Sequence, residues 1–219
     1  GFSKGDVGLI ATALAVSYGL SNFVMGNVSD RTNTRYFMAT GLILSGAINL
    51  LFPTLAGSLW AMAALWFVNG WAQGMGWAPC ARTLTHWFSD DERGTRFAFW
   101  NLAHNVGGGI VGPIINGALA LAAILGLAAV AGDGKLPFFL IFYVPALMAI
   151  GMGVLIAMFL RDTPQSCGLP PIEEYTNDYP DTGVADPERE LGAKEIFVNH
   201  ILYNKPLWII AIANIFVYV

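Results

Sequence analysis

The sequence predicts an all-α membrane protein. Of the 219 residues, 55% are hydrophobic and 12% are charged, and the mean hydropathy is +0.56. Soluble proteins carry about 25% charged residues. The charges are also bunched, so that four long runs contain none: 7–29, 36–81, 97–132 and 136–160. Each run exceeds the roughly 20 residues that a helix needs to cross a bilayer, which excludes an ordinary soluble enzyme.

Five crossings and the start of a sixth helix follow from these runs. The crossings are 7–26, 36–55, 58–80, 97–120 and 137–160. The second run is long enough to cross twice, and Pro53 and Gly57 mark the break within it. A sixth helix opens at 207–219 and is too short to span.

The basic residues predict the orientation. Nine of the 11 fall on one side of these crossings, and only Lys4 and Lys135 fall on the other. Since Lys and Arg accumulate in cytoplasmic loops, residue 1 is expected outside. Two crossings within 97–132 would invert this bias. We therefore expect one crossing there, with an apolar outer extension over 119–136.

Three regions follow along the chain. Residues 1–160 are expected to form part of an N-terminal transmembrane half with five crossings, and 206–219 to begin a C-terminal half. Between them, 161–205 holds nine acidic and four basic residues and is expected to be a central cytoplasmic loop. Within it, 193–204 has apolar residues at helical spacing, which fits a helix on the membrane surface or a packed connector helix. Because the chain starts with Gly1 rather than Met, we expect an internal piece of a longer protein.

Residue types exclude other classes of function. A net charge of −4 and a pI near 5.2 give no basic surface for nucleic acid. Cys80 and Cys167 have no partners at the spacings of a disulfide framework or a zinc site. The three histidines lie in separate segments, and the predicted crossings hold no acidic residue. We therefore expect no catalytic centre, no metal site and no cofactor.

Polar and aromatic side chains form stripes on three crossings. The stripes are Tyr18 and Asn22; Asn69, Gln73 and Trp77; and Asn101, His104 and Asn105. Residues three and four apart share a helix face, so converging stripes would line a polar cavity. For a single Asn or Gln, a hydrogen bond to a neighbouring helix is the competing interpretation. An imidazole changes charge near neutral pH, which favours a functional role for the histidine.

Glycines and charged turns give weaker signals. The pairs Gly70/Gly74 and Gly108/Gly112 predict close contacts between helices. The match of 107–112 to the dinucleotide pattern GxGxxG is rejected, because that fingerprint needs a preceding strand. On the expected inner side, charged turns at 30–35 and 90–96 would form either ion pairs or solvated loops.

Five segments are similar to one transporter family. They are 1–37, 69–95 (NGWAQGMGWAPCARTLTHWFSDDERGT), 100–109 (WNLAHNVGGG), 161–181 (RDTPQSCGLPPIEEYTNDYPD) and 212–219. The chain thereby resembles the organophosphate:phosphate antiporter branch of the major facilitator superfamily. The resemblance implies that fold, with helices 2–6 of twelve, the central loop and the start of helix 7 present, and the first helix missing.

The resemblance implies a transporter and not an enzyme. It implies exchange of external sn-glycerol 3-phosphate for internal inorganic phosphate, through rocker-switch alternation of two halves. We therefore expect a small-molecule carrier in the lipid bilayer of a bacterial or archaeal inner membrane, working as a monomer. An antiporter of another organophosphate, such as a hexose phosphate or phosphoglycerate, and a sensor of organophosphate are the alternatives.

The resemblance also implies the site. His104 matches the substrate-linked histidine of this branch, Tyr18 matches a pore tyrosine, and Gln73 and Trp77 match pore-facing positions. Asn22 stands where members that carry glycerol phosphate have a lysine, which removes a positive charge from the pathway and leaves the choice of organophosphate open. The two phosphate-binding arginines of the branch belong to helix 1 and to a later part of helix 7, so neither lies in this chain.

Overall fold

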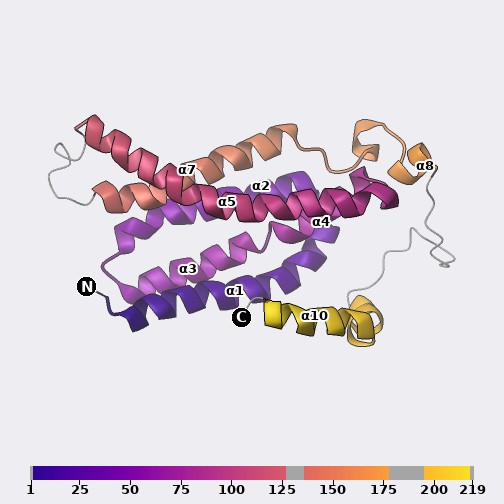
Figure 1. Ribbon diagram of the computed structural model, residues 1–219, viewed down its shortest axis with the longest axis horizontal. Coiled ribbons are helices and arrows are strands. Elements are labelled where there is room, and N and C mark those ends of the chain that lie inside the picture. Colours follow the sequence, from indigo (N-terminus) through magenta and orange to yellow (C-terminus); the bar gives the residue numbers. More distant parts are fainter. Residues whose placement is uncertain (1, 127–135, 178–194, 218–219) are drawn as a thin grey trace. The chain divides into compact units, whose positions relative to one another are not determined.

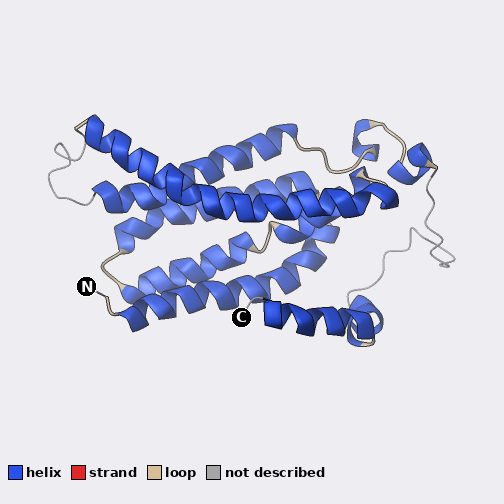
Figure 2. Cartoon of the chain, viewed as in Figure 1, coloured by secondary structure: helices blue, strands red, loops and turns tan. Residues whose placement is uncertain are grey.

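The computed structural model describes residues 2–126, 136–177 and 195–217. All regular structure within these ranges is helical (Figure 2). The chain separates into two compact units, Gly1–Tyr179 and Pro180–Val219. Of the outer extension expected over 119–136, residues 127–135 lie outside the described part.

The first unit consists mainly of long helices (Figure 1). Its elements are α1 (Lys4–Asp30), α2 (Thr34–Leu51), η1 (Phe52–Leu55), α3 (Leu59–Gln73), α4 (Trp77–Trp87), α5 (Asp90–Ile124), α7 (Leu136–Phe159), η2 (Gln165–Cys167) and α8 (Ile172–Thr176). Among the described residues, four stretches are long and apolar enough to cross a membrane: α1, α2 continued by η1, α5 and α7. They coincide with four of the five expected crossings.

The prediction of a single helix for the remaining crossing, 58–80, was wrong. The chain forms α3, then a break, then α4. The break falls at Gly74-Met75-Gly76, where two glycines weaken the helix. The two helices meet at the break, and the second extends beyond the expected end at residue 80.

Side-chain chemistry at two helix starts explains their positions. At α1, Ser3 Oγ accepts from the Asp6 N–H at 3.2 Å, while the Asp6 carboxylate accepts from the Ser3 N–H at 2.8 Å. At α5, Asp90, Asp91 and Glu92 occupy the first turn, where negative charge suits the helix dipole. This helix therefore begins before the expected residue 97.

Glycines allow the closest helix packing. The helix α1 packs along α3, and α2 packs along α7 (Figure 1). A Cβ on Gly46 of α2 would lie 2.6 Å from Ile150 Cγ1, and a Cβ on Gly153 of α7 would lie 2.7 Å from Ile43 Cγ1. Both distances are too short for real Cβ contacts, so a side chain at either position would force the neighbouring helix to shift.

The two glycine pairs of the sequence behave differently. The contact expected for Gly70 and Gly74 is confirmed: a Cβ on Gly70 would lie 2.5 Å from Leu14 O of α1. The contact expected for Gly108 and Gly112 was wrong for the described residues. Neither position on α5 has an atom within 4 Å of an added Cβ.

An apolar cluster joins α1, η1, α3 and α7. Its buried members are Ile10, Phe52, Met62 and Ala63. The Phe52 ring lies 4.9 Å from the Trp66 ring and 4.8 Å from the Phe142 ring, measured between centroids. Phe52, near the end of the second expected crossing, therefore packs against the third crossing through Trp66 and against the fifth through Phe142.

The second unit contains η3 (Ile196–Leu202), a short π-helix, and α10 (Lys205–Val217). Asn204 directly precedes α10, and its Oδ1 accepts a hydrogen bond from the Leu207 N–H at 3.2 Å. Of the described part of the expected segment 193–204, residues 195–202 are helical, and the location of this helix on a membrane surface stays a prediction.

Candidate functional site

A cavity of about 550 Å³ lies among the helices of the first unit. Its walls come from α1, α2, α3, α4, α5 and α7. The lining residues are Tyr18, Met38, Gly41, Leu42, Ser45, Ala72, Gln73, Gly76, Trp77, Cys80, Trp100, His104 and Ile156. Its volume is that of a small-molecule site.

Four of the five side chains expected to form the site lie on this lining. Tyr18 comes from α1, Gln73 ends α3, Trp77 begins α4, and His104 comes from α5. Asn22 lies one turn after the tyrosine, is half-buried, and is not part of the lining. The structure thus brings together side chains from four helices, which correspond to three of the expected crossings, and leaves one expected residue outside.

Aromatic rings and sulfur atoms form one part of the wall. The Trp77 and Trp100 rings meet edge to face, with centroids 5.2 Å apart. The Cys80 thiol approaches Met38 Sδ at 3.8 Å. Sequence reasoning missed Trp100, although it lies four residues before His104 and so shares its helix face.

Asn69, expected in the same stripe as Gln73, is not on the lining. Its side chain is 0% exposed, and Ser45 Oγ of α2 donates to its Oδ1 at 2.6 Å. The competing interpretation, a hydrogen bond between helices, is therefore correct for this residue. Ser45 itself reaches the cavity, so the pair lies directly behind the wall.

The lining offers neutral hydrogen-bond donors and one imidazole. Tyr18 supplies a hydroxyl, Gln73 an amide, and Trp77 an indole N–H. No Asp, Glu, Lys or Arg occurs among the residues that line this cavity in the described part. No group of three or more metal-binding side chains is found within the described ranges. His104 adds an imidazole, whose ring nitrogens can donate hydrogen bonds, so the cavity suits a polar or anionic small molecule.

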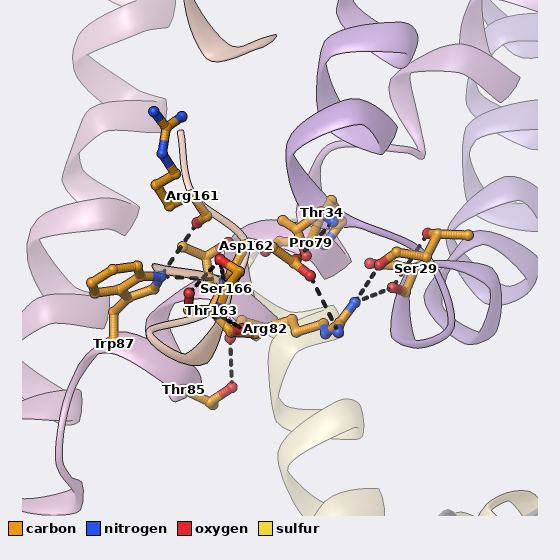
Figure 3. A network of polar contacts seen from close by, with 12 residues as sticks. Ser29, Thr34, Pro79, Arg82, Thr85, Trp87, Arg161, Asp162, Thr163 and Ser166 are labelled. Carbon is orange, nitrogen blue, oxygen red and sulfur yellow. Dashed lines mark hydrogen bonds and ion pairs between the residues drawn. The ribbon is translucent and has the colours of Figure 1, made fainter. Parts of the chain in front are cut away.

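A second polar group joins the helix ends around Arg82 (Figure 3). We call it the Arg82 network; its members are Ser29, Thr32, Thr34, Arg82, Trp87, Arg161 and Asp162. The Arg82 guanidinium donates to Ser29 O at 2.8 Å and to Thr32 O, and lies 3.9 Å from the Asp162 carboxylate. That carboxylate accepts from the Thr34 N–H at 2.8 Å. The Trp87 indole N–H donates to the carbonyls of Arg161 and Asp162, each at 3.3 Å.

The charges of this network match the helix dipoles. Arg82 lies at the C-terminal carbonyls of α1, where a cation is favourable. Asp162 lies at the first N–H of α2, where an anion is favourable. The network therefore ties the ends of α1, α2 and α4 to the segment after α7.

The charged turns also contain pairs. At the start of α5, Arg93 pairs with Asp90 and donates to Thr85 O at 3.1 Å and Phe88 O at 3.2 Å. Within 30–35, Arg35 donates to Ala157 O of α7. The ion-pair interpretation is therefore correct for the turn at 90–96. The turn at 30–35 is held to α7 by a hydrogen bond to a backbone carbonyl instead.

Comparison with known proteins identifies the family. The model of the Major Facilitator Superfamily matches residues 1–219. The chain belongs to the Major Facilitator Superfamily. With its long apolar helices, this membership makes it a multi-pass, all-α membrane protein.

Three curated relatives within the superfamily show the range of functions. The glycerol-3-phosphate transporter of Bacillus subtilis (strain 168) is 50% identical over 221 residues, which cover 100% of this chain and 47% of the relative. The probable hexose phosphate transport protein of Chlamydia pneumoniae is 42% identical, covering 100% and 47%. The membrane sensor protein UhpC of Escherichia coli (strain K12) is 42% identical, covering 99% and 46%. The chain spans just under half the length of these relatives.

Sequence reasoning missed the Arg82 network in this superfamily member. It pointed to the charged turns, whereas Arg82 and Asp162 come from the ends of uncharged runs. Arg82 directly follows the run 36–81, and Asp162 lies just after the run 136–160. Both residues follow crossings that end on the same side of the membrane, and their charges are opposite. These two facts together could have predicted the Arg82–Asp162 pair from the sequence.

Proposed function

We propose that this chain supplies most of the N-terminal half, and the start of the C-terminal half, of a transporter that exchanges external sn-glycerol 3-phosphate for internal inorganic phosphate. The observation that carries the proposal is the cavity on which Tyr18, Gln73, Trp77 and His104 meet. Relatives named for the transport of glycerol 3-phosphate and hexose phosphate support the substrate class.

The lining fits the parts of such a substrate. An anion that leaves water needs donors and positive charge in return. His104 in its protonated form supplies charge, and the Tyr18 hydroxyl and Gln73 amide supply neutral donors. The rings of Trp77 and Trp100 offer apolar surface to the carbon skeleton.

One imidazolium does not balance a phosphate dianion. We therefore propose that two arginines, which the family resemblance implies in helices that are not part of this sequence, supply the remaining positive charge. Substrate binding is therefore a property of the complete protein, and every functional test uses it.

The same proposal covers the wider arrangement. Residues 1–160 belong to the N-terminal half, 161–205 form the cytoplasmic loop, and 206–219 begin the C-terminal half. Residue 1 lies outside a bacterial or archaeal inner membrane, and the monomeric protein alternates by a rocker-switch movement of its halves.

Counterflow tests the reaction. The complete protein is reconstituted into liposomes loaded with inorganic phosphate, and uptake of labelled glycerol 3-phosphate is measured. We expect uptake that requires internal phosphate and exceeds uptake of glucose 6-phosphate or 3-phosphoglycerate. Uptake of a sugar phosphate without uptake of glycerol 3-phosphate would show that the proposed substrate is wrong. Uptake into liposomes that contain no internal phosphate would exclude antiport.

A sensor is the second candidate, because one relative at 42% identity is named a membrane sensor protein. The same liposomes separate the two. A sensor would bind glycerol 3-phosphate, as measured by calorimetry, without exchanging it. Rapid exchange would exclude a protein that only senses.

A further inference from the structure

The chain breaks between α3 and α4 at the wall of the cavity. Gln73 ends α3 and Trp77 begins α4, and both side chains line the cavity. Between them, the Met75 N–H bonds to Ala72 O at 3.2 Å and the Gly76 N–H bonds to Gln73 O at 3.2 Å. Both bonds reach back three residues, where a continuous α-helix would reach back four.

The break frees the carbonyl of Trp71. In a continuous helix this oxygen would accept from the Met75 N–H, which here bonds to Ala72 O instead. A backbone carbonyl without a partner is costly inside a membrane. The Ser21 hydroxyl of α1 donates to Trp71 O at 2.7 Å and so replaces the missing helical donor.

Ser21 fits at this place because Gly74 has no side chain. The serine is 0% exposed, and a Cβ on Gly74 would lie 2.6 Å from Ser21 Cβ and still closer to its Oγ. The two residues therefore interlock. The serine supplies the donor that the break requires, and the glycine supplies the room for the serine.

We propose that Ser21 is a positioning residue for substrate exchange. By satisfying Trp71 O it keeps the third crossing broken, and the break sets the direction in which α4 leaves α3. If the Met75 N–H returned to Trp71 O, the tight turn would become α-helical and α4 would rotate. That rotation would move Trp77 from its contact with Trp100 on the cavity wall. This role rests on the function proposed above.

Ser17 provides a matched control. It lies one turn earlier on α1, is also 0% exposed, and donates to Phe67 O of α3. Phe67 lies inside α3, well before the break, so its carbonyl keeps a helical donor. Loss of the Ser17 hydroxyl therefore removes a bond between helices without removing the support of the break.

The exchange assay compares Ser21→Ala with Ser17→Ala in the complete protein. We expect Ser21→Ala to raise the KM for glycerol 3-phosphate about 3- to 15-fold, the range that corresponds to one hydrogen bond between membrane helices. Ser17→Ala should leave KM unchanged, while both variants lower thermal stability by similar amounts. Equal effects of the two variants on KM, including no effect, would overturn the role of Ser21.

A second readout separates this role from the proposed function. Cys80 lies on α4 three residues after Trp77 and lines the cavity. Its rate of labelling by a water-soluble maleimide is measured in protein whose other cysteines are replaced by serine. We expect Ser21→Ala to change this rate and Ser17→Ala to leave it unchanged. If the parent protein shows no exchange, the proposed function fails, and an unchanged labelling rate in Ser21→Ala overturns the positioning role on its own.

Discussion

The Asp162 carboxylate accepts a hydrogen bond from the backbone N–H of Thr34 at 2.8 Å, across 128 positions of sequence. Asp162, in the segment that follows α7, thus caps the start of α2. The helix has no cap of its own, because Asn33 at its N-cap makes no side-chain hydrogen bond. The same carboxylate pairs with Arg82, which holds the end of α1.

Removal of this carboxylate should destabilise the first unit. We expect Asp162→Ala to lower the free energy of unfolding by about 1–2 kcal/mol, because it removes both a helix cap and a charge at a helix dipole. Asp162→Asn should cost less, since the amide oxygen still accepts from Thr34. Thermal unfolding in detergent measures both. Glu174→Ala, at an exposed position of α8, is the control, and equal melting temperatures for Asp162→Ala and this control would contradict the prediction.

Alanine substitutions at two glycines, Gly46 of α2 and Gly151 of α7, should change stability in opposite directions. Gly46→Ala would bring a Cβ to 2.6 Å from Ile150 Cγ1 and 2.8 Å from Ala146 O, so it should cost about 1–3 kcal/mol of stability. Gly151→Ala meets no atom within 4 Å and should stabilise α7 by about 0.5–1 kcal/mol. The midpoint of thermal unfolding reports both. A neutral Gly46→Ala would show that the two helices separate easily.

His86 should make stability depend on pH. Burial lowers its pKa below the ordinary value of 6.5, and the charge of Arg82 lowers it further, while Asp162 and Glu173 oppose the shift. As pH falls through 6.5, the unfolded chain takes up a proton that the folded protein does not, so the stability present above this pH is lost.

The measurement for His86 is the melting temperature between pH 7.5 and pH 5. His86→Gln should flatten this dependence over the range just below pH 6.5 and leave the melting temperature at pH 7.5 nearly unchanged. An identical pH dependence in the parent protein and the variant would exclude this histidine as the source.

His104 should contribute to substrate affinity. We expect His104→Asn in the complete protein to weaken phosphate binding about 10- to 100-fold, the range for a hydrogen bond from a charged group. The profile of exchange rate against pH should also change. The control is Asn105→Ala: the next residue on α5 bonds to Asn101 O and is absent from the cavity lining. Similar affinities for both variants would remove the histidine from the site.

Local hydropathy was enough to predict most helices but not the break between α3 and α4. Long uncharged runs reveal crossings because every residue in a crossing must be compatible with the hydrocarbon core of the bilayer. The break depends on the contact between Ser21 of α1 and Gly74. These residues are far apart in the sequence, so hydropathy averaged over a short window cannot show their contact. Periodicity likewise placed Gln73 and Asn69 on one face. Only the neighbouring helix decides that the first reaches the cavity and the second pairs with Ser45.

The glycine pairs show the same limit. Gly70/Gly74 and Gly108/Gly112 have equal spacing, yet only the first pair is in close contact among the described residues. The spacing of two glycines indicates where another helix can pack closely. Whether a helix does pack there depends on the small or polar residues of that second helix. The Arg82–Asp162 pair was missed for a related reason, since its members come from crossings that the sequence does not order in space.

The position of Asp162 in the chain has a consequence for biosynthesis. A ribosome delivers α1, α2 and α4 into the membrane long before it reaches this residue, so until then Arg82 has no carboxylate to pair with and the start of α2 has no cap. Newly made helices should therefore stay accessible to quality-control proteases until the fifth crossing has been threaded. A nascent polypeptide stalled at residue 155 should be degraded faster than one stalled far enough downstream for Asp162 to have left the ribosome.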